Sequence, residues 1–223
     1  MQSAADLAAW WTDLKVGLAM LTRLPLRHDA ETSGQTLARA GRVMPLIGAL
    51  VGLVGAAVFW LAGSLGLPPL VAGLLAVTAT MLFTGAFHED GLADVADGFG
   101  GAFERNRKLE IMRESTIGAY GALALILSVG VRAAALGAIA EPAAAAAALV
   151  AAHAVARSFL PAVMVTTPLA RTEGLAAGAG EPAPGHAGVA LILAAVIAVA
   201  MLGLGTGVLS LALSAAAAAA MVL

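Results

Sequence analysis

The chain has 223 residues, no cysteine and a formal net charge of −2. Its residues are 61% hydrophobic and only 12% charged, and the mean hydropathy is +0.93. A soluble domain carries charge on about a quarter of its residues, so this composition excludes an ordinary soluble protein and favours one surrounded by membrane lipid. The lack of cysteine excludes disulfides and thiolate metal sites. We expect no nucleic-acid partner.

The first 42 residues contain one modestly apolar stretch, from Val16 to Leu21, which is too short to cross a membrane. Trp10 and Trp11 precede it, and tryptophan is enriched at the depth of the lipid headgroups. We therefore expect an interfacial or re-entrant helix. The segment lacks the basic run and short apolar core of a secretory signal peptide.

The rest of the chain predicts about six membrane spans. The last apolar segment is too long for one crossing of a hydrocarbon core of about 30 Å, and we expect it to break at the glycines between 203 and 207. The predicted fold is an all-α, polytopic membrane helix bundle that forms one catalytic domain over residues 1–223. The apolar segments are 43–67, 70–87, 117–140, 143–165 and 188–223.

The lysine and arginine residues outside these spans predict the orientation. They fall before residue 43, in the loop 88–116 and in the loop 166–187, whereas the connections on the opposite side contain none. Basic residues mark the cytoplasmic side of a membrane protein. We therefore predict a bacterial inner-membrane protein with both loops in the cytosol. The basic positions are Lys15, Arg23, Arg27, Arg39, Arg42, Arg105, Arg107, Lys108, Arg113 and Arg171.

An acidic motif, His-Glu-Asp-Gly-Leu-Ala-Asp-Val-Ala-Asp-Gly, occupies residues 88–98. Asp90, Asp94 and Asp97 are spaced i, i+4 and i+7, so on a helix they lie within an arc of roughly 60°. Three carboxylates at a membrane boundary repel one another unless a cation neutralises them. Such hard oxygen ligands select Mg²⁺, Mn²⁺ or Ca²⁺, and Mg²⁺ commonly bridges carboxylates to substrate phosphates. We expect a Mg²⁺ site; the alternative is a solvated acidic helix end.

Four other residues of the motif are candidates for substrate binding or proton transfer. Gly91 and Gly98 leave room for a phosphate to approach the backbone. His88 and Glu89 adjoin the aspartates, which suits contacts around the metal and substrate or transfer of a proton.

A basic segment follows the motif. Arg105, Arg107, Lys108 and Arg113 are candidates for binding a diphosphate, because guanidinium groups pair with phosphate in a bidentate manner. The preference of basic residues for the cytoplasmic side explains the presence of each of these residues, taken singly, just as well. We favour Arg113, because it lies in the stretch 111–121 where the third span begins.

Two arginines lie within predicted spans, where charge is costly and indicates function. Arg157 lies nearer the cytoplasmic end of its span, so we expect it to reach a phosphate. Arg132 lies nearer the other end, and extension of its side chain to the membrane surface explains it as well. His153 is one turn from Arg157 and suits a buried hydrogen bond at least as well as catalysis.

Two stretches, Gly-Ala-Phe-His-Glu-Asp-Gly-Leu-Ala-Asp-Val-Ala-Asp-Gly (85–98) and Glu-Ile-Met-Arg-Glu-Ser-Thr-Ile-Gly-Ala-Tyr-Gly (110–121), resemble the cobalamin synthase, or adenosylcobinamide-GDP ribazoletransferase, family. Residues 21–26 and 44–48 also match its N-terminal pattern. The resemblance implies a Mg²⁺-dependent inner-membrane enzyme that joins adenosylcobinamide-GDP to α-ribazole or its 5′-phosphate and releases GMP. The motif aspartates of the family map onto Asp90, Asp94 and Asp97.

The mechanism implied by the resemblance is attack of the ribazole 5′-hydroxyl on the phosphorus attached to the corrinoid arm. Arg113, with Arg157 as a second candidate, neutralises the developing charge. Glu89 or Glu114 accepts the hydroxyl proton, and Ser115 contacts the substrate. An oligomer or a docking partner from cobalamin biosynthesis is left open.

The chain departs from the family pattern at two places. Arg113-Glu114-Ser115-Thr116 stands where members often have Lys-Asp-Ser-Arg, so the charge at the last position is lost. Members usually end in a glycine-rich Gly-Gly-x-Thr-Gly-Asp-type segment, and we expect this segment to be missing from a chain that stops at Leu223.

Two other functions fit parts of the pattern. A CDP-alcohol phosphotransferase also uses aspartates beside a span, but its differently spaced aspartates and Ala-Arg pair are not found here. A cation-coupled transporter predicts acids at the membrane midplane and inverted repeats. Here the aspartates follow the span and no repeat is visible.

Overall fold

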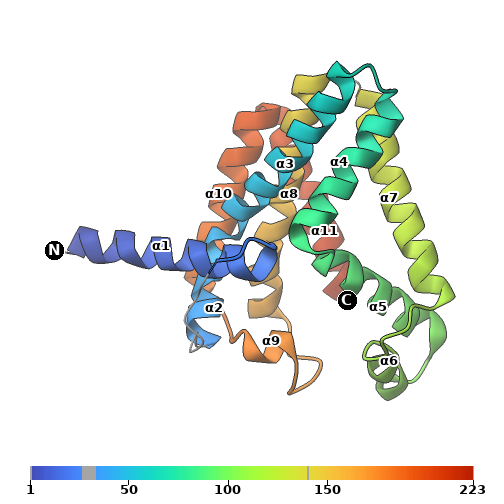
Figure 1. Cartoon of the computed structure of the whole chain (residues 1–223). Coiled ribbons are helices and arrows are strands. Elements are labelled where there is room, and N and C mark those ends of the chain that lie inside the picture. Colours follow the sequence, from blue (N-terminus) through green and yellow to red (C-terminus); the bar gives the residue numbers. More distant parts are fainter. Residues whose placement is uncertain (1, 27–33, 140, 223) are drawn as a thin grey trace. The chain divides into compact units, whose positions relative to one another are not determined.

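The computed structural model describes residues 2–26, 34–139 and 141–222, apart from the side chains of residues 2–5 and 222 (Figure 1). All regular secondary structure in these ranges is helical. The chain divides into two compact units: unit 1 comprises Met1–Ala56 with Ala146–Leu223, and unit 2 comprises residues 57–145. The chain passes from one unit to the other within two long helices, α3 and α8.

Unit 1 has two clusters of buried hydrophobic residues, one near its N-terminal end and one between residues 151–155 and 194–198. Leu21, Val43 and Ile47 are fully buried at the first. Alanines dominate the second, where Ala151 packs with Ala194 and Ala198. The helices of unit 1 are α1 (Gln2–Leu21), α2 (Gly34–Ala40), the short 3₁₀ helix η1 (Gly41–Val43), the first part of α3 (Met44–Ser64), most of α8 (Pro142–Thr166), α9 (Leu175–Gly178), α10 (Pro184–Leu202) and α11 (Leu204–Val222).

Glycines bring α3 and α8 into close contact. A Cβ atom at Gly52 would lie 2.6 Å from the carbonyl oxygen of Leu149, and one at Gly48 would collide with the carbonyl group of His153. Small residues allow helix backbones to approach in this way within membranes.

Helix α1 is tied to α2 and η1 by a buried charge cluster. Asp13 is completely buried and accepts hydrogen bonds from Arg39 Nε at 2.8 Å and Arg42 Nε at 2.7 Å. The Arg42 guanidinium also lies 4.3 Å from the centre of the Trp10 ring. Trp10 is therefore a packing residue, whereas Trp11 is 60% exposed. The N-terminal helix that we expected spans 20 residues, longer than the apolar stretch that suggested it.

Unit 2 is built on the packing of two apolar helices, α4 (Pro69–Thr84) and α7 (Ala119–Ile139). A Cβ atom at Gly73 would lie 2.5 Å from the carbonyl oxygen of Ala133, and one at Gly137 would lie 3.1 Å from Leu70. Two further helices, α5 (Phe87–Gly101) and α6 (Arg105–Ile111), occupy most of the segment that we predicted as a loop. The acidic motif is thus helical, as its spacing indicated.

A sharp turn separates α4 from α5, whose axes differ by 95°. Gly85 and Ala86 produce it with φ angles of 69° and 58°, both in the left-handed region. Such backbone is disfavoured for a residue with a side chain. Because of this turn, α5 leaves the direction of α4.

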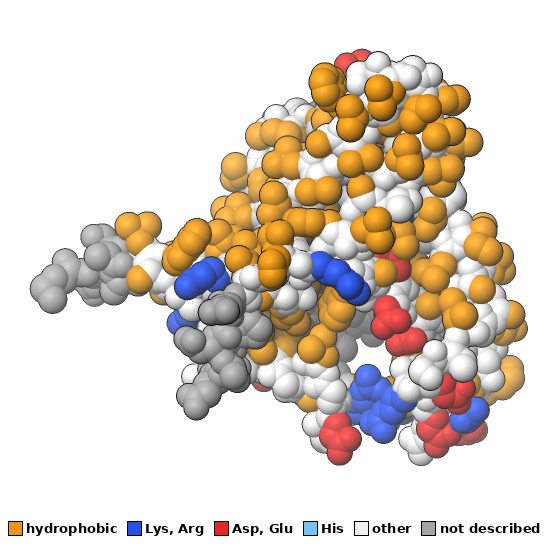
Figure 2. Space-filling model, in the orientation of Figure 1, with side chains coloured by type: hydrophobic (Ala, Val, Ile, Leu, Met, Phe, Trp, Pro, Cys, Tyr) orange, Lys and Arg blue, Asp and Glu red, His pale blue; other side chains and the backbone are white. Residues whose placement is uncertain are grey.

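The described helices confirm an all-α polytopic membrane protein. Five are long and apolar enough to cross a membrane, or up to six if the bent pair α4 and α5 forms one span. Helix α1 is not among them. The final apolar segment breaks at Gly203, whose φ of 79° ends α10. Large apolar side chains are exposed along these helices, including Ile126 at 68% and Ile192 at 64%, and Figure 2 shows hydrophobic side chains over much of the visible surface.

Candidate active site

The acidic motif lines a cavity of about 430 Å³ in unit 2. Helix α5 forms one wall, and the connection between α6 and α7 forms another. The polar residues on these walls are Glu89, Asp90, Asp94 and Asp97 from α5, and Arg113, Glu114, Ser115 and Thr116 from the connection. The acidic motif and the stretch 110–121, which are separate in the sequence, therefore meet around one cavity.

Asp90 and Asp94 occupy successive turns of α5. Asp90 is exposed and Asp94 is half-buried, and both line the cavity. Carboxylates one turn apart on a helix project from the same face. These two side chains are placed to meet a ligand that enters the cavity.

Asp97 has a different environment, because it is buried against the start of α7. Its two carboxylate oxygens accept hydrogen bonds from the backbone N–H groups of Gly118 at 2.7 Å and Gly121 at 2.8 Å. A Cβ atom at either glycine would collide with this carboxylate. Negative charge is stabilised at a helix N-terminus. No role was predicted for these glycines, although their spacing of three residues at the start of a predicted span is a signal in the sequence.

Glu89 is also buried and is paired with Arg132 of α7. Arg132 Nη1 donates to Glu89 Oε1 at 3.1 Å, and Arg132 Nε donates to the carbonyl oxygen of Ser128. The sequence left open whether Arg132 is functional or extends to the membrane surface. In the structure it reaches the acidic helix.

The basic residues predicted to bind a diphosphate separate into two groups. Arg113 lines the cavity. Arg107 instead contacts the carboxylates of Glu110 at 3.0 Å and Glu114 at 3.2 Å, and these neighbours raise the pKa of Arg107. Lys108 lies 4.1 Å above the Phe99 ring. Arg105, Arg107 and Lys108 do not line the cavity, and binding of a diphosphate by Arg113 stays a prediction.

The two glycines of the motif differ in their surroundings. The space that a Cβ atom would occupy at Gly91 is open. At Gly98 the side chain of Met112 and the carbonyl of Lys108 fill it, so Gly98 serves the packing of α5 on α6 and leaves no room there for a phosphate. The His88 ring packs edge-on against Phe87 and is not part of the cavity wall.

Arg157, a predicted phosphate ligand, belongs to unit 1. It is buried, and its Nη1 lies 2.9 Å from His153 Nδ1. The hydrogen-bonded histidine that we considered is therefore present. Contact of Arg157 with a phosphate stays a prediction.

The oxygen ligands at the cavity suit a hard divalent cation, since five carboxylates and two hydroxyl groups line it. Within the described ranges, however, no three histidine or acidic side chains are close enough together to hold a metal ion. Mg²⁺ needs only one or two protein carboxylates when substrate phosphates and water complete its shell. Asp90 and Asp94 provide such a pair.

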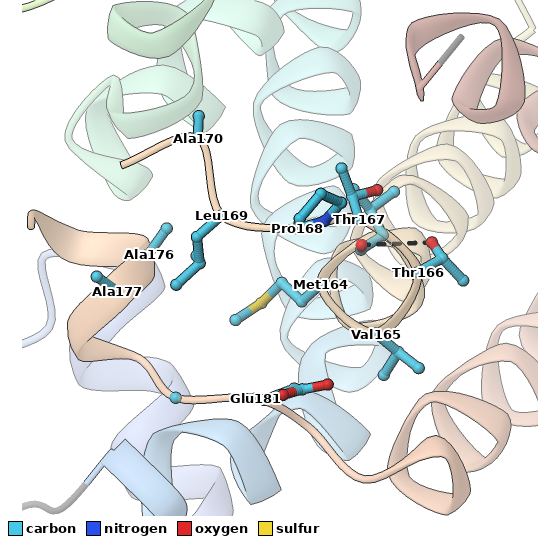
Figure 3. A pocket seen from close by; sticks show the side chains of 12 residues that line it. Met164, Val165, Thr166, Thr167, Pro168, Leu169, Ala170, Ala176, Ala177 and Glu181 are labelled. Atoms are coloured by element: carbon cyan, nitrogen blue, oxygen red, sulfur yellow. Dashed lines mark hydrogen bonds between the residues drawn. The ribbon is translucent and has the colours of Figure 1, made fainter. Parts of the chain in front are cut away.

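Unit 1 contains a second cavity, of about 550 Å³, between the end of α8 and the region around α9 (Figure 3). Met164, Leu169 and the α9 alanines contribute apolar surface, and the Thr166 hydroxyl is bonded to carbonyls within α8. Among the described residues that line it, Glu181 carries the only charge. The described lining residues include none of the basic groups that a diphosphate requires.

Comparisons with known proteins agree with the resemblance noted in the sequence. Proteins named adenosylcobinamide-GDP ribazoletransferase are 51% identical over 170 residues in Bradyrhizobium diazoefficiens, 52% over 168 residues in Mesorhizobium japonicum and 55% over 113 residues in Shewanella amazonensis. These alignments cover 76%, 75% and 51% of this chain. They cover 65%, 64% and 43% of the relatives, so the chain spans less than two thirds of their length. No solved structure matches the chain.

A family model described as cobalamin-5-phosphate synthase matches residues 13–223. This range includes all of unit 2, unit 1 from residue 13 onward and every residue that lines the acidic cavity. The chain belongs to the cobalamin-5-phosphate synthase family.

Proposed function

We propose that this chain transfers the adenosylcobinamide phosphate group from adenosylcobinamide-GDP to α-ribazole or α-ribazole 5′-phosphate, and releases GMP. The observation that carries the proposal is the cavity in which Asp90 and Asp94 lie with Arg113, within a chain of this family. Carboxylates that bind a divalent cation, together with a guanidinium group, are what a diphosphate substrate requires.

The residues act by binding and orienting the diphosphate. Asp90 and Asp94 would hold Mg²⁺, which would withdraw charge from the phosphate oxygens. Arg113 pairs with a phosphate oxygen and stabilises the negative charge that develops during transfer. Ser115, on the same wall, donates a hydrogen bond to the substrate.

A hydroxyl oxygen of the ribazole sugar forms a bond to the phosphorus attached to the corrinoid arm. The 5′ oxygen cannot serve for both acceptors, because it already carries the phosphate in α-ribazole 5′-phosphate. The bond from this phosphorus to the bridging oxygen breaks, and GMP leaves with that oxygen and its electron pair. The hydroxyl proton passes to a carboxylate at the cavity. Both carboxylates are paired with an arginine, but Glu114 is better placed, because its side chain is 46% exposed whereas that of Glu89 is 11% exposed.

The direct test is a GMP-release assay on the detergent-solubilised or nanodisc-embedded chain with adenosylcobinamide-GDP, α-ribazole and Mg²⁺. We expect GMP and adenosylcobalamin in equal amounts, and no turnover by the Asp94→Asn variant. Absence of GMP release from a well-folded sample would refute the proposal for this chain. A CDP-alcohol substrate pair serves as the control for the rival phosphotransferase, and we expect no product from it.

We also propose that the chain lies in the bacterial inner membrane with the acidic cavity facing the cytosol. The basic residues around α6 and the lack of lysine and arginine in the connection after α3 support this orientation. Since the chain has no cysteine, single cysteines report it directly. In intact spheroplasts a membrane-impermeant maleimide should label Ser64→Cys and spare Asn106→Cys; the reverse pattern would place the cavity outside.

A further inference from the structure

We propose that the four acidic residues of α5 divide into two pairs with different roles. Glu89 and Asp97 are positioning residues that hold α5 on α7, whereas Asp90 and Asp94 face the substrate diphosphate and its cation. The role of the second pair rests on the proposed function, and the role of the first rests on the geometry of unit 2.

The two pairs lie on adjacent rows of the helix. Glu89, Ala93 and Asp97 are spaced i, i+4 and i+8, and they are exposed by only 9%, 7% and 9%. Residues at this spacing share one face, and this face packs on α7. Asp90 and Asp94 form the next row, about 100° further round the helix. Asp97 therefore belongs with Glu89, although its sequence spacing also matches the other two aspartates.

Each residue of the buried pair has its own source of positive charge. Glu89 is bonded to the guanidinium of Arg132, and Asp97 to two backbone N–H groups at the N-terminus of α7. A buried carboxylate is stable when it is hydrogen-bonded in this manner. Neither residue needs a metal ion to neutralise it, and Asp90 and Asp94 line the cavity one turn apart.

The junction around Asp97 is shaped to receive a carboxylate. Gly118 and Gly121 lack the side chains that would collide with it. On the α5 side, Gly100 makes room for the Tyr120 ring, which a Cβ atom would meet at 2.5 Å. Glycines on both helices thus permit a close contact that places the start of α7 against α5.

This contact has a consequence for the reaction. The connection that carries Arg113 and Ser115 ends where α7 begins, so Asp97 fixes the end of the wall that faces Asp90 and Asp94. Loss of the Asp97 carboxylate should misplace this wall and slow transfer without removing a metal ligand.

The test compares Asp90→Asn, Asp94→Asn and Asp97→Asn in nanodiscs, with Gly73→Ala as a matched control. A Cβ atom at Gly73 disturbs the packing of α4 on α7 without contacting α5. Two measurements do not depend on turnover: Mn²⁺ affinity by electron paramagnetic resonance, and hydrogen–deuterium exchange of the amides at 118–121. The third measurement is kcat for GMP release, compared between variants whose Tm falls by the same amount.

We expect Asp97→Asn to speed exchange at 118–121, to leave Mn²⁺ affinity unchanged and to lower kcat more than Gly73→Ala does. Asp90→Asn and Asp94→Asn should leave exchange unchanged and weaken Mn²⁺ binding by at least about tenfold, the smaller end of what metal-site changes cost. Weaker Mn²⁺ binding by Asp97→Asn with unchanged exchange would overturn the proposal. If the wild-type chain binds no Mn²⁺, the metal part of the proposed function fails, and unchanged exchange in Asp97→Asn would still overturn the positioning role.

Discussion

Two buried aspartates, Asp13 in unit 1 and Asp97 in unit 2, are neutralised in different ways. Asp13 is bonded to the Nε atoms of Arg39 and Arg42, at 2.8 and 2.7 Å. Asp97 is bonded to the backbone N–H groups of Gly118 and Gly121, at 2.7 and 2.8 Å. The distances are nearly the same, but the partners of Asp13 are charged side chains and those of Asp97 are peptide groups at a helix end.

The difference decides what each aspartate demands of the rest of the sequence. Asp13 requires the two cationic side chains of Arg39 and Arg42. Loss of either the carboxylate or the cations leaves the opposite charge without its partner. Asp97 requires two backbone N–H groups that no side chain blocks. Its partners are therefore glycines, and the absence of their side chains is what allows the carboxylate to approach. The first arrangement is therefore sensitive to charge, and the second is sensitive to volume.

The largest effect is expected for Asp13→Asn. This change leaves the Arg39 and Arg42 guanidinium groups without the charge that neutralises them, and breaking a buried ion pair costs about 3 kcal/mol. Thermal unfolding in detergent measures the loss. Asp6→Asn, on the exposed part of the same helix, is the control and should leave Tm unchanged. Equal Tm values for the two variants would contradict a stabilising role of the cluster.

Gly121→Ala tests the sensitivity of Asp97 to volume. The added methyl group occupies the position of the carboxylate, and overpacking of this kind costs about 2 kcal/mol. Gly130→Ala is the matched control in the same helix, because nothing lies within 4 Å of its added methyl group. We expect this control to raise stability by about 0.5–1 kcal/mol through helix propensity. Similar Tm shifts in the two variants would exclude a special role for Gly121.

Arg132→Gln tests the other contact between α5 and α7. The Arg132 side chain is 36% exposed, so water compensates part of the loss, and we expect a cost of about 1 kcal/mol. Ser128→Ala is the control, because Arg132 bonds the carbonyl of residue 128 and not its hydroxyl. The double variant Arg132→Gln with Glu89→Gln should cost little more than the single one. Additive losses would show that the two side chains do not interact.

The smallest effect is expected at Glu141, an exposed counterpart of Asp97. Its carboxylate accepts hydrogen bonds from the backbone N–H groups of Ala143 at 3.0 Å and Ala144 at 2.6 Å, at the start of α8. These bonds, that from Ala143 first, lower the pKa of Glu141 below its ordinary value of 4.5.

A group with a lowered pKa stabilises the folded state above its unfolded pKa, and this stabilisation is lost as pH falls through the folded value. Glu141→Gln should therefore lower Tm slightly at pH 7, and the difference from wild type should vanish as the pH falls well below 4.5. A difference that is constant with pH would contradict the assignment.

The sequence predicted the helices well, because their signals are local. Apolar length and the proline turns located the spans, and the glycines near 203 located the final break. The turn at Gly85 and Ala86 was missed, since alanine gives no indication of a left-handed backbone. The segment 88–116 was expected to be a cytosolic loop with its aspartates on a helical stripe, and most of it forms α5 and α6. The helical spacing of the aspartates was therefore a better guide to its structure than its concentration of charge.

The acidic motif was found from the sequence as well, and Arg113 lines the cavity whereas its basic neighbours do not. The assignment of roles within the motif depended on contacts that no spacing rule contains. Asp97 fits the i, i+4, i+7 pattern with Asp90 and Asp94, but its carboxylate is bonded at the start of α7. Gly98 was expected near a phosphate and is packed against Met112.

The sequence by itself determined that this is a helical membrane protein with a clustered set of carboxylates, since hydropathy and helical periodicity are properties of neighbouring residues. Only the tertiary structure decided which carboxylates are buried and which face the cavity. The physical reason is that Asp97 and Glu89 are neutralised by groups 21 to 43 residues away. Backbone amides and a distant arginine become partners of α5 only when α7 packs beside it.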